Sequence, residues 1–301
     1  MSSTAGTTTP ASPSGENKKT KVALTGTQET LLGTLSAKAT DAVSPSSILK
    51  DKWAAELLTK VDYDFSRLGV NNWLQAWCVI RSRNLDRWAS EFFDLHAHSP
   101  EGATVLHLGC GLDSRALRLQ RYFGRMKLRW VDVDLPDVIS LRGQLAAAPD
   151  VDSHGQSSYE LLAASVTEPD WFRHIPANRP TLILFEGLSM YLAEEDARDM
   201  IRRLVGHFAQ GQLIFDAVNS FFVASQRWVA PIAKSGSTLK WYVDRPLAIE
   251  SWADGLSLRD EVFLTSRPEI KECSWKIRLQ FGLAASLPVI HQYSRELRYS
   301  F

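Results

Sequence analysis

Three residues in the middle of the chain have the types and the spacing of a nucleoside site. Gly109 and Gly111 follow a short apolar run at 104–108, and Asp134 follows a second apolar run at 128–133, 25 residues after Gly109. Glycines after a buried strand let the backbone bend sharply and let a ligand pass close to it. A carboxylate at the end of the next strand can bind both hydroxyls of a ribose. The pattern therefore predicts a nucleoside pocket.

The glycine turn also indicates which class of nucleotide would bind. A dinucleotide fingerprint has a third glycine and presents a helix N-terminus to a pyrophosphate. Ser114 stands at that third position. A ribose acid without this glycine favours a nucleoside that carries no phosphate, and we expect S-adenosylmethionine. The alternatives are structural: the glycines could form only a tight turn, and Asp134 could cap the helix that starts near Pro136.

Alternating strands and helices must position these residues. The clearest helical pattern places apolar residues at i, i+3, i+4, i+7, i+8 and i+11 between 197 and 208. Short apolar runs predict strands at 104–108, 128–133, 159–163, 181–185 and 212–215. Strands and helices in this alternation predict an α/β fold with a doubly wound, mostly parallel Rossmann-like sheet.

Two helical patterns precede the sheet, at about 22–65 and 72–96. They predict an N-terminal helical cap over residues 22–100. Residues 101–301 would then form the Rossmann-like core, with elements on the substrate side near the C-terminus. In this interpretation residues 22–301 make a single domain.

The two ends of the chain have less regular patterns. Residues 1–21 contain Ser, Thr, Pro, Gly and Lys with almost nothing large and apolar, which predicts a disordered tail. Beyond residue 219 the pattern indicates a helix near 220–233, then a loop, and then a helix and strands.

Composition argues against several classes of partner and location. The 34 basic residues equal the 34 acidic residues in number, so no general attraction to nucleic acid or to an anionic membrane is expected. Three cysteines cannot make a disulfide framework. No apolar run approaches the ~20 residues of a membrane span, and the first residues lack the apolar core of a secretory signal. We therefore expect a cytoplasmic protein with a small-molecule substrate, in an oligomeric state that the sequence does not reveal.

Several motifs resemble the leucine carboxyl methyltransferase family. The stretch 108–115, LGCGLDSR, is similar to the family motif L-G-x-G-x-D-[ST]-R. The stretches VDLP at 133–136 and EGLSMYL at 186–192 are similar to further family motifs, in the same order. VDYDF at 61–65 and LKW at 239–241 are closer to one branch, the tetracenomycin-type polyketide O-methyltransferases. The resemblance extends from about residue 31 to residue 298.

The resemblance implies a class I methyltransferase that uses S-adenosylmethionine. It implies O-methylation of a carboxylate or a phenolic hydroxyl on a small aromatic or polyketide-type metabolite. Two alternatives stay open: a protein C-terminal carboxyl methyltransferase, and a methyltransferase-like protein that binds the cofactor but catalyses another reaction.

The resemblance also assigns cofactor contacts by position. Arg81 matches the arginine that binds the methionine carboxylate, for which a planar guanidinium is well suited. Lys38 lies near a family basic residue that faces the same carboxylate. Glu186 matches a glutamate near the ligand's amino group, while Gly109 and Asp134 match the packed glycine and the ribose acid. The alternatives are an ordinary surface ion pair for Arg81 and a solvated acid for Glu186.

Three further positions complete the predicted site. Ser165 stands where the family has an aspartate beside adenine, and a hydroxyl can still accept a hydrogen bond from the adenine amino group. Tyr191 and Trp241 are the candidate substrate contacts, although an aromatic residue after a strand can equally pack on a helix. No metal is expected.

No catalytic residue is identified. His107 is expected to be a buried histidine with its hydrogen bonds satisfied, Cys110 to be a small filler, and His291 to be a weak candidate for a substrate contact. A phenol acceptor would gain from a general base, which is usually histidine, and the sequence shows no His-Asp constellation to supply one. A carboxylate acceptor needs no base, so the pattern mildly favours a carboxylate or an acidic phenol.

Overall fold

The computed structural model describes residues 19–22, 26–151 and 155–301. Most of the predicted tail lies outside the described residues. Thr20 and Lys21, which were included in that tail, instead form strand β1 (Thr20–Lys21), which pairs in parallel with β2 (Val61–Asp62).

A seven-stranded sheet forms the centre of the molecule, in the order β5-β4-β3-β6-β7-β9-β8. All five strands expected from the sequence are present and pair in parallel, and β9 runs antiparallel to both of its neighbours. The bounds are β3 (Ala103–Leu108), β4 (Leu128–Asp134), β5 (Ser158–Ala163), β6 (Thr181–Phe185), β7 (Gly211–Val218), β8 (Ser257–Phe263) and β9 (Ser294–Ser300). Because β3 lies between β4 and β6, the strand order reverses there, which is where ligands bind in such sheets.

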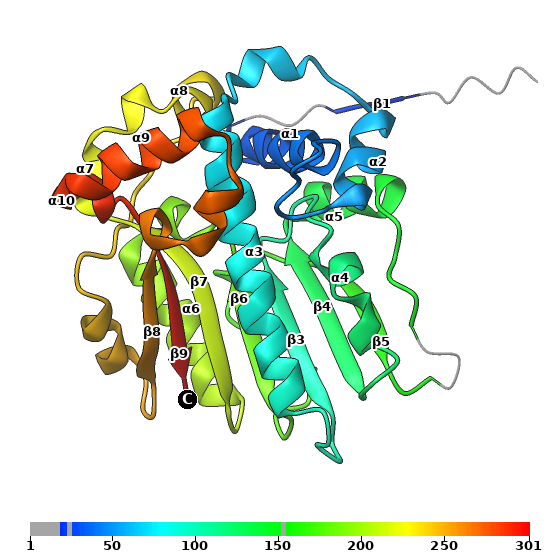
Figure 1. Ribbon diagram of the computed structural model, residues 1–301. Helices are drawn as coiled ribbons and strands as arrows, with labels where there is room; N and C mark the ends of the chain where they lie inside the picture. The colour runs from blue at the N-terminus through cyan, green and yellow to red at the C-terminus, as the bar shows by residue number, and fades with distance from the viewer. Residues whose placement is uncertain (1–18, 23–25, 152–154) are drawn as a thin grey trace, which may run out of the picture.

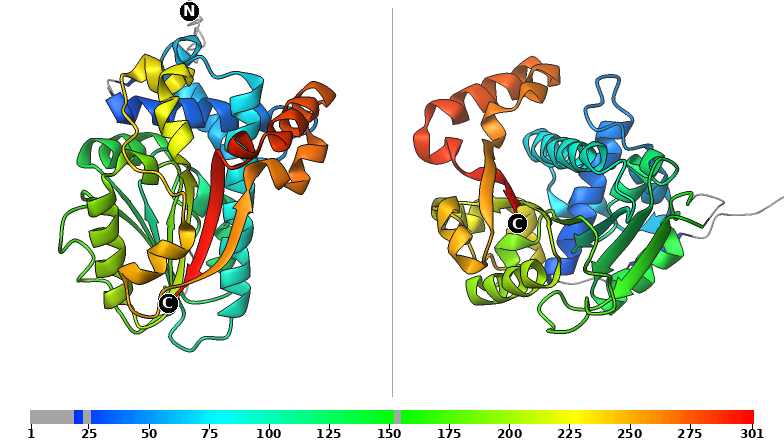
Figure 2. Two further views of the ribbon diagram at one scale, coloured as in Figure 1. Left: turned by 90° about the vertical axis from the view of Figure 1, so that its left-hand side faces the viewer. Right: turned by 90° about the horizontal axis from the view of Figure 1, so that it is seen from below.

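Helices cover both faces of the sheet and one of its ends (Figure 1). In the described part of the chain they are α1 (Thr30–Ala42), α2 (Lys52–Lys60), α3 (Asn72–Leu95), α4 (Arg115–Arg118), α5 (Pro136–Leu145), α6 (Glu194–His207), α7 (Ser220–Ala224), α8 (Ala230–Ser235), α9 (Trp275–Ser286) and α10 (Pro288–His291). The long helix α3 packs on one face and α6 on the other. The helices α9 and α10 project beyond the end of β8 and β9 (Figure 2).

The helices α1 and α2 lie above the carboxyl ends of the central strands (Figure 1). Leu32 and Leu35 of α1 and Leu57 of α2 form a buried cluster with Leu112 and Leu145 of the core. Burial of this apolar surface holds the cap on the sheet. The fold is therefore the predicted α/β fold, a mostly parallel Rossmann-like sheet with an N-terminal helical cap. The cap is smaller than the predicted residues 22–100, because α3 packs on a face of the sheet and only the elements before it lie over the strand ends.

Two helices are shorter than their sequence patterns predict. Residues 116, 119 and 123 recur at helical spacing in the sequence, which predicts a longer helix, but the helix there is a single turn, α4, followed by a 3-10 helix at Gln120–Tyr122. Leu119 and Phe123 pack into the cluster under α3 from this bent segment. The helix expected near 220–233 is divided into α7 and α8, and Pro231 lies in the first turn of α8, where its missing N–H breaks no helical bond.

Candidate active site

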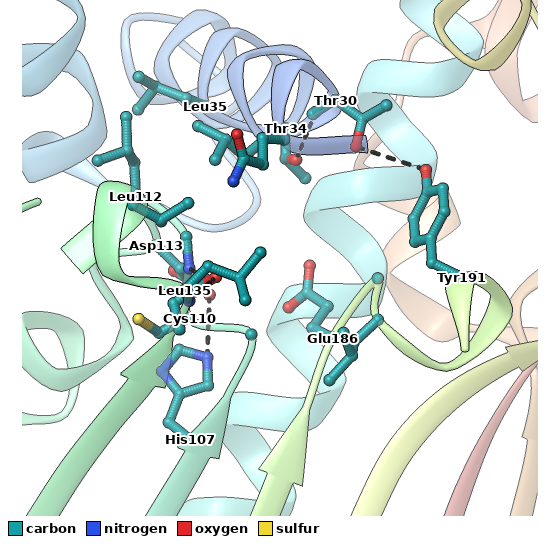
Figure 3. Close-up of a pocket in the computed structure, with 18 of the residues that line it drawn as sticks. Thr30, Thr34, Leu35, His107, Cys110, Leu112, Asp113, Leu135, Glu186 and Tyr191 are labelled. Atoms are coloured by element: carbon teal, nitrogen blue, oxygen red, sulfur yellow. Dashed lines mark hydrogen bonds and ion pairs between the residues drawn. The ribbon is translucent and has the colours of Figure 1, made fainter. Parts of the chain in front are cut away.

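A cavity of about 310 Å³ lies between the carboxyl ends of β3, β4 and β6 and the helix α1 (Figure 3). Most residues that the sequence assigned to a ligand contribute to its wall. They are Lys38, Arg81, Gly109, Gly111, Asp134, Ser165, Glu186 and Tyr191. The sheet topology thus gathers residues from the cap, from α3 and from four strand ends around one space.

The glycine turn after β3 has the backbone conformation that only glycine adopts without strain. Gly109 and Gly111 have φ angles of 60° and 50°. A Cβ atom on Gly109 would lie 3.2 Å from the side chain of Leu188. The turn therefore brings backbone directly to the cavity, as a close-packed ligand requires.

Asp134 at the end of β4 fixes this turn. Its Oδ2 accepts a hydrogen bond of 2.7 Å from the N–H of Gly111, and its Oδ1 accepts one of 2.8 Å from the N–H of Leu135. Each carboxylate oxygen keeps a further lone pair, so the side chain can still accept from two ribose hydroxyls. Burial raises the pKa of Asp134, and the two N–H groups oppose this rise. The helix α5 has no side-chain cap, so the cap alternative for Asp134 is not what the structure shows.

The wall near Asp134 is mostly apolar. Leu112, Leu135 and Val166 contribute to it, and Ser165 lies beside them with its hydroxyl 2.8 Å from that of Thr167. A slot of this kind can hold a planar purine while one hydroxyl binds its edge. The donors, acceptors and apolar wall at this end of the cavity fit an adenosine.

The other end of the cavity is charged and is centred on Glu186, which follows β6. The carboxylate of Glu186 lies 3.0 Å from Nη2 of Arg81 and 3.4 Å from Nζ of Lys38, and Arg115 contacts it as well. The hydroxyl of Ser82 donates to it at 2.7 Å. Burial alone would raise the pKa of Glu186, but the charges of Lys38, Arg81 and Arg115 outweigh burial and hold the pKa far below its usual value. Glu186 is therefore a fixed carboxylate rather than a solvated one.

Arg81 is held between two strands. Its Nη1 donates to Asp216 at 2.8 Å, and its Nε and Nη2 donate to Glu186. The residue is 7 % exposed, which excludes the surface ion pair considered from the sequence. A guanidinium has five N–H groups, so each Nη retains one for a carboxylate ligand. The charged end of the cavity thus fits an amino-acid group.

Sequence reasoning assigned no role to Arg115 or Asp216. Arg115 is fully buried and contacts Asp86, Asp113 and Glu186 beneath the cavity. Asp216 accepts from Arg81 and, at 2.7 Å, from the N–H of Gly187. Each had a signal in the sequence: Arg115 is part of the LGCGLDSR motif, and Asp216 lies near the carboxyl end of a parallel strand.

The structure corrects the conclusion that the chain has no His-Asp pair. Nδ1 of His107 lies 2.9 Å from Oδ1 of Asp132, so a His-Asp pair exists although the sequence spacing did not reveal it. The two residues are directly opposite each other in β3 and β4. Nε2 of His107 lies 3.2 Å from Nη1 of Arg115. Both ring nitrogens are engaged, as expected for a buried histidine with satisfied hydrogen bonds.

The structure also corrects the expectation for Trp241. Its side chain is 3 % exposed and packs in the core against Phe215 and Trp252, with ring centroids 6.2 Å and 5.5 Å away. It does not contribute to the cavity wall, so a substrate contact there has no support. His291 lies on α10, where Thr265 is 2.6 Å from its Nδ1, and it is likewise absent from the wall.

Other kinds of site have no support in the described residues. Within residues 19–22, 26–151 and 155–301 there is no group of three or more metal-ligating side chains. No helix in this part of the chain is long and apolar enough to cross a membrane. Cys110 contributes to the wall, but burial raises the pKa of its thiol well above the usual value. It is therefore a neutral thiol and a poor nucleophile.

Comparisons with known proteins agree with this geometry. Residues 32–205 match the family "Leucine carboxyl methyltransferase". The tetracenomycin polyketide synthesis O-methyltransferase TcmP of Streptomyces glaucescens is 37% identical over 280 residues, which cover 93% of this chain and 98% of that protein. The S-adenosyl-L-methionine-dependent methyltransferase dpfgK of Gibberella zeae is 35% identical over 261 residues, 82% of this chain and 85% of that protein.

The fold has a solved counterpart as well. A DUF574 family protein from Streptomyces avermitilis superposes with a TM-score of 0.56 at 14% identity, covering 84% of this chain and 95% of that chain. This likeness supports the fold alone, and the sequence relatives support the family. The chain belongs to the leucine carboxyl methyltransferase family and is an S-adenosylmethionine-dependent O-methyltransferase.

Proposed function

We propose that the protein methylates an acidic oxygen, a carboxylate or an acidic phenol, on a small aromatic metabolite of polyketide type. The observation that carries this proposal is the division of one cavity into a mostly apolar end at Asp134 and a charged end at Glu186. The polyketide class is supported by the 37% identity to a polyketide O-methyltransferase over nearly the whole chain.

The cofactor contacts follow from this division. Asp134 would bind the ribose hydroxyls, the N–H groups and glycines of the 109–111 turn would lie against the nucleoside, and Ser165 would bind the adenine edge. At the other end Arg81 and Lys38 would bind the methionine carboxylate, and Glu186 would bind the ammonium group. When bound, the cofactor supplies an electrophilic methyl group on a sulfonium.

The chain's own contribution is to orient the ligands and to exclude water. Lys38 reaches from α1 to Asp113 at 3.1 Å and to Glu186, so the cap is tied to the charged end of the cavity. Leu35 of α1 and Leu112 of the core both contribute to the cavity wall on the same side (Figure 3). Fixed charges and the exclusion of water would favour a displacement that needs alignment of the two reacting atoms.

Tyr191 marks the acceptor side in this proposal. Its ring lies across the cavity from Cys110 and Leu135, on the far side of Glu186 (Figure 3). The hydroxyl donates to Oγ1 of Thr30 at 3.4 Å, and burial raises the pKa of the phenol. Tyr191 is therefore a neutral, amphipathic contact for an aromatic acceptor and not a base.

The acceptor must arrive as an anion or as an acidic hydroxyl. His107 is the histidine of the described cavity wall, and both of its nitrogens are engaged. Glu186 is held as a carboxylate by three cations, which makes it a weak proton acceptor. A neutral alcohol would need a general base, and neither His107 nor Glu186 is suited to that role.

Radiolabelled methyl transfer tests the proposal. The purified protein is incubated with S-adenosylmethionine labelled in its methyl group and, in separate reactions, with aromatic carboxylic acids, acidic phenols, aliphatic alcohols and a peptide that ends in leucine. We expect label in the acids or phenols. Label only in the peptide would support the protein carboxyl methyltransferase instead, and no label in any acceptor despite cofactor binding would support a different reaction.

We also propose that the protein acts in the cytoplasm as part of secondary metabolism. Cys78, Cys110 and Cys273 are all free thiols, which suits a reducing compartment. Fractionation of the source cells with an antibody to the protein would test this location.

A further inference from the structure

A buried carboxyl group, Glu296 on β9, lies outside the cavity wall and is not among the proposed cofactor contacts. Its side chain is fully buried. One of its oxygens accepts a hydrogen bond from Nδ2 of Asn84, and the other, Oε1, has no hydrogen-bond partner among the described residues. An ionised carboxylate in such a place would be costly, because it is neither hydrated nor paired.

The sheet register places this carboxyl beside the anchor of Arg81. Glu296 is directly opposite Asp216 in the antiparallel pair of β9 and β7. Side chains opposite each other in such a pair point to the same face and lie close together. The helix α3 contacts both of them from positions one turn apart: Arg81 donates to Asp216 at 2.8 Å, and Asn84 donates to Glu296.

Three other cations lie near Glu296, and each pairs with another residue. Arg267, from the loop before the 3-10 helix η8 (Pro268–Glu272), donates from Nη2 to Glu269 at 3.1 Å, while its buried Nε has no hydrogen-bond partner among the described residues. Arg87 of α3 donates to the amide oxygen of Asn84 at 2.7 Å. Arg298, two residues along β9, pairs with Asp260 and Glu91. Two carboxyl groups therefore share the neighbourhood of Arg81, which Glu186 also engages.

The different hydrogen-bond partners of Asp216 and Glu296 determine which of the two carboxyl groups holds a proton. Burial raises the pKa of Asp216 as well, but Arg81 and the N–H of Gly187 both donate to its carboxylate and oppose this rise. Glu296 has only the amide of Asn84. Burial raises the pKa of Glu296 to about 8, although Arg267 and the bond from Asn84 oppose the rise. Near neutral pH the proton therefore stays on Glu296.

We propose that Glu296 is a positioning residue for the cofactor site: its uncharged carboxyl leaves Arg81 to Asp216 and Glu186, and its ionisation draws the guanidinium of Arg81 away from the ligand. The mechanism needs only a proton, which bulk solvent takes up. It rests on the proposed role of Arg81 as the group that binds the methionine carboxylate. It predicts that cofactor affinity falls as the pH rises, because of the ionisation of a group that lies outside the cavity.

Two ligands separate this effect from a general effect of pH. S-adenosylhomocysteine carries the carboxylate, and methylthioadenosine has the same adenosine and thioether without it. Calorimetry on the full chain between about pH 6.5 and 8.5, where the ammonium group of the ligand stays protonated, should show S-adenosylhomocysteine weakening about threefold relative to methylthioadenosine.

The variant Glu296→Gln keeps the shape of the side chain and cannot ionise. It should bind S-adenosylhomocysteine as the wild type does near pH 7 and should lose the alkaline fall. The matched control is Glu101→Gln, which changes an exposed carboxyl between α3 and β3 and should keep the wild-type profile.

Three results would overturn the proposal. The first is an alkaline fall of equal size in wild type and Glu296→Gln. The second, which needs no variant and so decides the matter if Glu296→Gln does not fold, is a parallel pH dependence of the two ligands in wild type. The third is no binding of either ligand at any pH. Of the three results, only this one would also contradict the proposed function.

Discussion

At the residue scale, Arg81 has two duties that a single substitution would disturb together. It is proposed to bind a ligand carboxylate, and it neutralises the buried carboxylates of Glu186 and Asp216. Removing one partner of a buried ion pair leaves the other charge uncompensated. A test of Arg81 must therefore separate ligand binding from folding.

We expect Arg81→Ala to weaken S-adenosylhomocysteine by about 2–3 kcal/mol and to leave methylthioadenosine almost unchanged, since only the former carries the carboxylate. Arg81→Lys should recover part of the loss, because an ammonium keeps the charge but not the planar pair of donors. Calorimetry at fixed pH measures both. The control is Arg83→Ala, an exposed arginine on the same helix. Equal losses for both ligands would mean that Arg81 supports the fold and not the ligand.

Asp134 offers a second test at this scale, because its two roles depend on different properties. Asp134→Asn keeps an oxygen for the N–H of Gly111 but loses the charge and part of the acceptor capacity. We expect both adenosine ligands to weaken by about 1–3 kcal/mol with a change in Tm of only a few degrees. Asp150→Asn, at an exposed carboxylate, is the control. A lower Tm with unchanged affinity would show that Asp134 serves only the turn.

At the element scale, α1 is the part of the cap that covers the cavity. Lys38 and Leu35 on this helix contact the core, and Gln28 in the preceding 3-10 helix η1 (Gly26–Glu29) donates to Asp137 at 2.7 Å. These contacts join the cap to the core, and an element at the edge of a fold can open locally at lower free energy than the central sheet.

We therefore expect saturating S-adenosylhomocysteine to slow amide hydrogen exchange in residues 30–42. The ligand would lie beneath α1 and add contacts to its inner face, so opening would cost more free energy. Exchange in α9, which projects away from the cavity, serves as the internal control. A ligand that protects α9 as strongly as α1, or that leaves α1 unchanged, would contradict a cap that opens for ligand access.

The same scale shows which features a sequence can predict. The central strands are short apolar runs and α6 has a strong helical periodicity, so their existence followed from the local pattern of apolar residues. The turn at 109–111 and Asp134 could be predicted because they lie a short, characteristic distance apart within one βαβ unit. The cluster of Arg115, Glu186 and Asp216 joins residues more than 70 positions apart or on different strands, and no local pattern encodes such a contact. The substrate contact expected at Trp241 has no support because a motif match gives a position in the chain and not the direction of its side chain.

At the scale of the whole molecule, buried charges set how stability depends on pH. Burial would raise the pKa values of Asp113, Asp132 and Glu186, but neighbouring cations, led by Arg118, Arg142 and Lys38 respectively, outweigh burial and lower all three. A carboxyl whose folded-state pKa lies below its unfolded value stabilises the fold above the unfolded value and loses this contribution as pH falls. Glu296 makes stability change with pH in the opposite direction, because its pKa is raised in the folded state to about 8.

These signs predict a stability maximum on the acid side of neutrality. Below about pH 4.5 the unfolded chain takes up protons before the three paired carboxyls do, so the urea midpoint should fall steeply. From there up to pH about 8 the unfolded chain ionises Glu296 while the folded chain resists, so stability should decline by at most about 4 kcal/mol. Glu296→Gln should remove this alkaline decline and leave the acid limb intact. Urea unfolding at pH 3.5, 5.5 and 8.5, with unchanged slopes to confirm two-state behaviour, measures both limbs. A wild-type midpoint that is higher at pH 8.5 than at pH 5.5 would show that Glu296 is ionised in the folded protein, and the source of its charge compensation would then have to be sought around Arg267.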